Sequence, residues 1–175
     1  MVNLKRRKAI NEMADIIREA LKLNTPVPVE NIPRMLGGKL SFLSELDQGM
    51  EAMITKRGEE FEISIKEDVY PLRQRFSIAH ELGHLVLHMG YLSNNELWRE
   101  SESYKDIVYY RNGFSIEEVE ANEFAGALLM PEEEFVEVAE DNLYEGVYAL
   151  EPIARHFQVS VDAVKVRGRW LGLFN

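Results

Sequence analysis

A cluster of three histidines is the strongest indication of the structure of this chain: His80, His84 and His88 lie within a stretch of nine residues. Apolar side chains recur around them at three- and four-residue spacing, with a proline at the start of this pattern and a glycine just beyond its end. The sequence therefore predicts a helix over residues 71–88. Because side chains four positions apart project from the same face of a helix, His80 and His84 should point to one place.

The stretch that begins at His80 reads His-Glu-Leu-Gly-His. Two imidazole nitrogens on adjacent turns can bind one zinc ion at about 2.0–2.1 Å each. Glu81 lies one residue further round the helix, where it can reach a water on the metal rather than the metal itself. This pattern is typical of metal-assisted hydrolysis. The chain has no cysteine, so any metal must be held by His, Asp or Glu.

The remaining histidines fit a metal site less well. His88 lies eight helical residues beyond His80, a rise of about 12 Å, whereas two nitrogens on one zinc ion lie within about 4 Å of each other. We therefore expect His88 at the C-terminus of the helix, where the helix dipole favours it. His156 is isolated in a short apolar segment, and we expect it to pack or to lie on the surface.

A carboxylate from a second helix should complete the site, and residues 117–123 offer four glutamates. Glu118 shares the apolar face of the helix predicted over residues 116–130, so periodicity favours Glu118 over Glu120 as the third ligand. Asn122 follows Glu118 by four positions and could orient a ligand histidine from behind. The glutamates expected to be solvated are Glu117, Glu120 and Glu123.

The rest of the chain indicates a mainly helical α+β fold. Residues 4–23 show the periodicity of an amphipathic helix, and its four basic residues at 5–8 should form a solvated face. Residues 40–65 contain three short apolar segments separated by turn residues, which predicts a three-stranded antiparallel sheet. We expect residues 1–145 to form one domain, with residues 146–175 as a C-terminal helix-turn-helix-like segment packed on it.

The negative charge is concentrated in one part of the chain. The formal net charge is −10, while residues 92–151 alone carry sixteen acidic and three basic side chains, a net −13. This distribution argues against nucleic acid as the main partner, because phosphate binding needs cations, and it favours a basic protein substrate near the metal. No run approaches the roughly 18 apolar residues of a membrane helix. The basic start lacks the apolar stretch of a secretion signal, so we expect a cytoplasmic protein.

Several ordered motifs together resemble the ImmA/IrrE metallopeptidase family. The segments that carry the resemblance are residues 73–88, 118–125, 128–131 and 159–163, with Arg111, Asn112 and Ser115 just before the glutamate helix. The resemblance extends over about residues 30–172. It implies a zincin-like, gluzincin-like peptidase with Zn²⁺ as its cofactor and Glu118 as the third ligand.

The same resemblance implies a protein substrate. Members of the family cleave an XRE-type helix-turn-helix repressor encoded nearby and so derepress phage, mobile-element or stress-response genes, and others belong to toxin–antitoxin-like pairs. Glu81 would then act as the general base. A second group should stabilise the oxyanion, and the candidates are Tyr104, Tyr109, Tyr110 and Arg111.

An alternative function comes from the C-terminal part of the chain. Residues 149–171 have the helix, turn and helix rhythm of a DNA-binding motif, and the basic residues Lys165, Arg167 and Arg169 lie on the second helix. On this interpretation the chain is a DNA-binding or protein-binding regulatory module with a catalytically silent metal site. The net charge of +3 for residues 152–175, from four basic residues and one acidic, is modest, so direct DNA contact is the less favoured reading.

Overall fold

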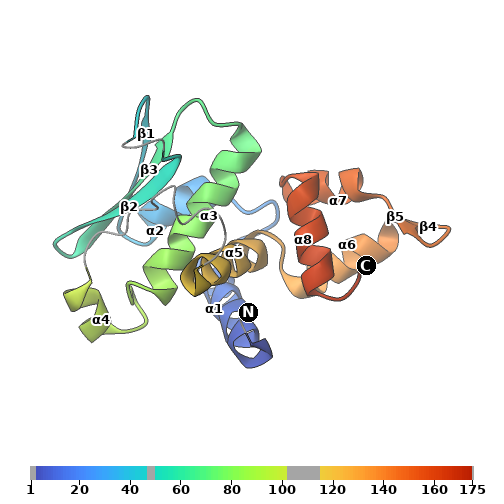
Figure 1. Cartoon of the computed structure of the whole chain (residues 1–175), viewed down its shortest axis with the longest axis horizontal. Coiled ribbons are helices and arrows are strands. Elements are labelled where there is room, and N and C mark those ends of the chain that lie inside the picture. Colours follow the sequence, from blue (N-terminus) through green and yellow to red (C-terminus); the bar gives the residue numbers. More distant parts are fainter. Residues whose placement is uncertain (1–2, 47–49, 102–114, 175) are drawn as a thin grey trace.

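The computed structural model describes residues 3–46, 50–101 and 115–174 (Figure 1). The helices of this part are α1 (Leu4–Ala20), η1 (Val29–Asn31), α2 (Ile32–Met35), α3 (Pro71–Leu87), α4 (Asn95–Glu100), α5 (Ile116–Leu129), α6 (Glu132–Asp141), α7 (Leu150–Phe157) and α8 (Val161–Trp170). The strands are β1 (Lys39–Leu43), β2 (Ala52–Arg57), β3 (Glu60–Lys66), β4 (Leu143–Tyr144) and β5 (Val147–Tyr148). The fold is mainly helical α+β, as the sequence predicts.

The three-stranded sheet is mixed, so the prediction of an antiparallel sheet is wrong. Its strand order is β1-β3-β2, with β2 antiparallel to β3 and β1 parallel to β3. Successive strands do alternate in direction. However, β3 lies between the other two, so β1 and β3, which run the same way, become neighbours. The central position suits β3 because its apolar side chains Phe61, Ile63 and Ile65 are all buried.

Helix α3 is the central helix of the fold. It contacts the sheet through β2 and β3 and packs along α5 (Figure 1). Every residue from Ile78 to Val86 is buried, as expected of a helix covered on all sides. Pro71 occupies the first turn, where its missing N–H costs nothing. The helix therefore holds its histidines inside the protein.

The remaining long helices form two groups, and α1 and α8 are the members that contact α5. Helix α1 lies along α5 and buries Ile10 and Ala14 completely. Helices α6, α7 and α8 gather with β4 and β5 at the other end of the molecule (Figure 1). The domain boundary predicted at residues 145 and 146 falls in the turn between β4 and β5, and the division into two parts stays a prediction. Within the described residues, no helix is long and apolar enough to span a membrane.

Candidate metal centre

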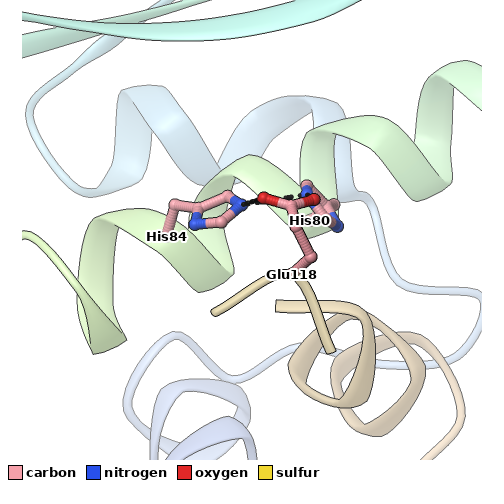
Figure 2. A group of neighbouring side chains, drawn as sticks. All are labelled: His80, His84 and Glu118. Atoms are coloured by element: carbon pink, nitrogen blue, oxygen red, sulfur yellow. Dashed lines mark hydrogen bonds and ion pairs between the residues drawn. The ribbon is translucent and has the colours of Figure 1, made fainter. Parts of the chain in front are cut away.

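The predicted zinc ligands meet between α3 and α5. Nε2 of His84 lies 3.1 Å from Oε1 of Glu118, and Nε2 of His80 lies 3.3 Å from Oε2 of the same carboxylate (Figure 2). The two Nε2 atoms are 3.0 Å apart. All three side chains are buried, and one ligand atom from each lies within 4.8 Å of the others. Two imidazoles and one carboxylate at such distances fit a zinc ion, which uses nitrogen and oxygen ligands at about 2.0–2.2 Å.

The N-terminus of α5 determines the position of Glu118. Ser115 is its N-cap, and the Ser115 hydroxyl accepts a hydrogen bond from the backbone N–H of Glu118 at 3.1 Å. Glu118 therefore lies in the first turn of α5, with its side chain directed at α3 (Figure 2). A negative side chain is favourable at this end of a helix because of the helix dipole.

Each histidine of the pair has a partner on the side of its ring away from Glu118. Nδ1 of His80 lies 3.0 Å from Oδ1 of Asn122. Asn122 is thus in the position predicted for a residue that orients a ligand histidine. An amide oxygen accepts a hydrogen bond, so the proton of His80 belongs on Nδ1, and Nε2 carries the lone pair that a metal needs.

A longer chain of contacts supports His84. Its Nδ1 lies 2.9 Å from Nδ1 of His88, and Nε2 of His88 lies 3.3 Å from Oε2 of Glu120. Arg6 of α1 donates to both oxygens of this carboxylate, at 2.8 and 2.5 Å. For His84 to bind a metal through Nε2, its Nδ1–H must donate to His88, whose Nε2–H then donates to Glu120. His88 is the C-cap of α3.

The protonation states of this pair suit metal binding. Burial lowers the pKa of His84 to about 4, and the hydrogen bond to Glu118 opposes this only in part. Burial also disfavours the ionised form of Glu118, but hydrogen bonds with His80 and His84 outweigh it and lower the pKa of Glu118 to about 2. At neutral pH His84 is therefore neutral and Glu118 ionised, which are the forms that bind metals.

The structure corrects the expectation that Glu120 and Glu123 are solvated. Both are buried, with 7% and 3% of their surface exposed. Glu123 accepts hydrogen bonds from Arg7 at 3.0 Å and from Asn11 at 2.8 Å. Arg6 and Arg7 from the basic start of α1 thus neutralise these two carboxylates, whereas Lys5 and Lys8 are exposed as predicted. Part of the negative charge of residues 92–151 is therefore neutralised by ion pairs inside the protein. This weakens the argument for a basic substrate.

The other predicted site residues are placed as follows. Glu81 is completely buried next to His80 on α3, and its role as general base stays a prediction. His156 is on the surface, with Nε2 2.8 Å from Oε1 of Glu134. The oxyanion candidates Tyr104, Tyr109, Tyr110 and Arg111 lie outside the described residues, as does Asn112.

Helices α7 and α8 follow one another with a short turn between them, but Arg167 does not face outward. It is 1% exposed, its Nε donates to the backbone oxygen of Met130 at 3.0 Å, and its Nη1 donates to Asn11 at 2.8 Å. Lys165 is paired with Asp162 at 3.0 Å. Arg167 therefore connects α8 to α1 and to the end of α5 through hydrogen bonds. Two of the three cations suggested for DNA binding, Lys165 and Arg167, thus bind groups of the protein itself.

Two buried histidines four residues apart, with a glutamate from a second helix, match the ligand pattern of metallopeptidases of the His-Glu-x-x-His type. The family model of the M78 peptidases, described as the IrrE N-terminal-like domain, matches residues 45–168. The chain belongs to this family, the ImmA/IrrE metallopeptidases.

A solved structure shares the fold over most of the chain. It is described as a Mycobacterium tuberculosis transcriptional regulator, and it is 19% identical with a TM-score of 0.63. The match covers 91% of this chain and 46% of that one, so this chain spans less than half the length of its structural relative. At this identity the likeness shows the fold alone. No curated protein matches the sequence significantly.

Proposed function

We propose that this protein is a zinc-dependent peptidase that cleaves an XRE-type helix-turn-helix repressor or antitoxin and so derepresses phage, mobile-element or stress-response genes. One observation carries the proposal: His80, His84 and Glu118 converge in a buried group, inside a domain of a metallopeptidase family. The XRE-type partner comes from the family resemblance. A repressor is found where DNA is, so we place the protein in the cytoplasm.

Each residue of the site would have a separate role in hydrolysis. His80, His84 and Glu118 would hold Zn²⁺, and Asn122 and His88 would fix the two imidazole rings. When bound, zinc supplies Lewis-acid chemistry that polarises a carbonyl and makes water acidic. The carboxylate of Glu81 would accept a proton from the attacking water and return it to the nitrogen of the leaving amine. Burial of the site keeps bulk water from competing with this transfer.

A cleavage assay with an isosteric control tests the proposal. The zinc-loaded protein is incubated with the purified repressor encoded in the neighbouring reading frame, and the fragments are identified by mass spectrometry. We expect the wild type to cut the repressor. We expect Glu81→Gln to bind zinc with unchanged stoichiometry and to leave the repressor intact, while Glu117→Gln, an exposed glutamate on α5, cuts at the wild-type rate.

Two results would contradict the proposal in different ways. Cleavage by Glu81→Gln at the wild-type rate would show that Glu81 is not the base. An intact repressor with the wild-type protein, together with a stable zinc-dependent complex, would favour a regulatory module with a catalytically silent metal site.

A further inference from the structure

A groove of about 550 Å³ lies between α3, α5 and α8. Its α3 wall includes Leu72 and Phe76, and its α8 wall includes Val166 and Trp170. Asn122, which holds the His80 ring, also lines it. The groove therefore begins directly behind a predicted metal ligand.

The groove continues the seam that holds the metal ligands. On α3, the row spaced by four residues runs His84, His80, Phe76 and Leu72. The matching row on α5 runs Glu118, Asn122 and Gly126 and ends at the C-cap residue Met130. The first pair, His84 with Glu118, and the second, His80 with Asn122, are in direct contact. The remaining members of both rows line the groove. Groove and metal centre are thus successive sections of one interhelical face.

The exposed surface of the groove is mainly apolar, and each of its charged side chains has an ion-pair partner elsewhere in the protein. Most of the groove's exposed surface comes from apolar atoms, with Leu72, Phe76 and Trp170 among the large side chains. Arg73 at its edge is paired with Glu51 at 2.5 Å, and Asp162 with Lys165 at 3.0 Å. An occupant gains from burying apolar surface here. A phosphate backbone would meet two arginines that already pair with carboxylates, Arg73 with Glu51 and Arg167 with Glu123.

The same geometry argues against DNA. In a helix-turn-helix, residues near the start of the second helix enter the major groove. In this structure the corresponding residues Ser160, Asp162 and Ala163 face the groove that α3 closes on the opposite side. Ser160 and Asp162 remain exposed, but a duplex that reached them would have to enter the groove between α8 and α3.

We infer that this groove binds a large apolar side chain of the protein substrate, about three residues from the scissile bond; this rests on the proposed peptidase function. Phe76 precedes the midpoint of His80 and His84 by six helical residues, a rise of about 9 Å at 1.5 Å per residue. An extended chain covers about 3.3 Å per residue, so three residues of substrate reach from the metal centre into the groove. The occupant is an extended peptide, and neither a duplex nor a second copy of this chain is required.

Gly126 allows the groove to be filled without disturbing its walls. A Cβ atom built on Gly126 has only Cδ of Arg167 nearby, at 3.8 Å, which is an ordinary contact. Gly126→Leu should therefore fold, and its side chain should occupy the floor of the groove. Ala9→Leu adds the same side chain at an exposed position of α1 and is the matched control. As a second variant, Val166→Lys places a charge on the α8 wall, where Val166 is 42% exposed.

Binding can be measured without turnover, because the two tryptophans of the chain report separately. Trp170 lines the groove, whereas Trp98 lies on α4. The Glu81→Gln protein is labelled with 5-fluorotryptophan, loaded with zinc and titrated with a capped alanine hexapeptide, the same peptide with one phenylalanine, or a 20-base-pair duplex. We expect the phenylalanine peptide alone to shift the ¹⁹F signal of Trp170, with Trp98 unchanged. Gly126→Leu and Val166→Lys should abolish the shift, and Ala9→Leu should keep it.

Cleavage of a peptide library by the wild type gives the second readout. We expect about 10-fold enrichment of large apolar residues three positions from the cut, lost in Gly126→Leu and kept in Ala9→Leu. A Trp170 shift caused by the alanine peptide or the duplex, or a shift that survives in Gly126→Leu, would overturn the inference. Cleavage without this preference would overturn it too while leaving the proposed function intact. If the wild type cleaves nothing, the peptidase proposal fails, and the ¹⁹F titration still decides whether the groove binds apolar side chains.

Discussion

Gly83, between the two histidines of the motif, controls how closely α3 and α5 approach. A Cβ atom added at Gly83 would lie 3.1 Å from Cα and 3.2 Å from the backbone oxygen of Ala121, and 3.3 Å from Cβ of Phe124. Carbon atoms in comfortable contact are about 3.5–4.0 Å apart. Two of the three neighbours are backbone atoms, which cannot rotate away. Gly83→Ala must therefore push the helices apart by about 0.5 Å.

This separation should weaken metal binding more than it weakens the fold. The two histidines belong to α3 and Glu118 to α5, and a functional site tolerates only about 0.5 Å of displacement. We expect zinc affinity to fall about 10- to 100-fold, the range seen when ligand orientation is lost. Overpacking costs about 1–3 kcal/mol, and replacing glycine in a helix returns about 1 kcal/mol. The metal-free protein should thus lose about 0–2 kcal/mol of unfolding free energy.

Competition with a chromophoric chelator measures the zinc dissociation constant, and urea unfolding of the metal-free protein measures stability. Gly126→Ala is the matched control. Gly126 also lies between α3 and α5, on the α5 side, but the nearest atom to its added Cβ is 3.8 Å away. It should keep wild-type zinc affinity. Equal zinc affinity in the wild type and Gly83→Ala would show that the close approach of α3 and α5 does not set the ligand geometry.

Three further predictions follow from the site and its supports. Zinc at 100 times its dissociation constant should raise the unfolding free energy of the wild type by about 2.7 kcal/mol, and a chelator should reverse this; thermal melts should show that Glu118→Gln loses the effect and Glu117→Gln keeps it. His88→Ala should weaken zinc binding about 10-fold in the chelator competition, because His84 loses the acceptor that fixes its ring; unchanged affinity would mean that this contact does not orient the ligand. Arg167→Ala should lower the unfolding free energy measured in urea by about 3–5 kcal/mol, because it removes one partner of a buried ion pair. Lys165→Ala, at a more exposed ion pair, should change it by at most about 0.5 kcal/mol. Equal effects of the two substitutions would contradict the structural role of Arg167.

Local patterns predicted the parts of the site that lie within one helix. The four-residue spacing placed His80 and His84 together, and the apolar face of α5 separated Glu118 from its neighbours. The structure brings these side chains together. In both cases helical periodicity fixes which residues share a face, so the sequence contains the information.

Partners distant in sequence could not be predicted in this way. Glu120 and Glu123 looked solvated because nothing near them reveals Arg6 and Arg7, which come from a helix more than 100 residues earlier. The order of the sheet depends on how the segment between β1 and β2 crosses, which the strand patterns do not encode. Helix α4 and the strands β4 and β5 were not anticipated, because elements of two to six residues are too short to show a period.

The X-ray absorption spectrum at the zinc edge, recorded on the protein loaded with one equivalent of zinc, identifies the atoms that bind the metal. We expect two imidazole nitrogens from His80 and His84 and oxygen ligands from Glu118 and solvent, all at about 2.0–2.2 Å. Glu118→Gln should remove or weaken the carboxylate contribution. A spectrum with three imidazoles, or a protein that binds no zinc at neutral pH, would contradict the assignment of His80, His84 and Glu118 as the metal centre.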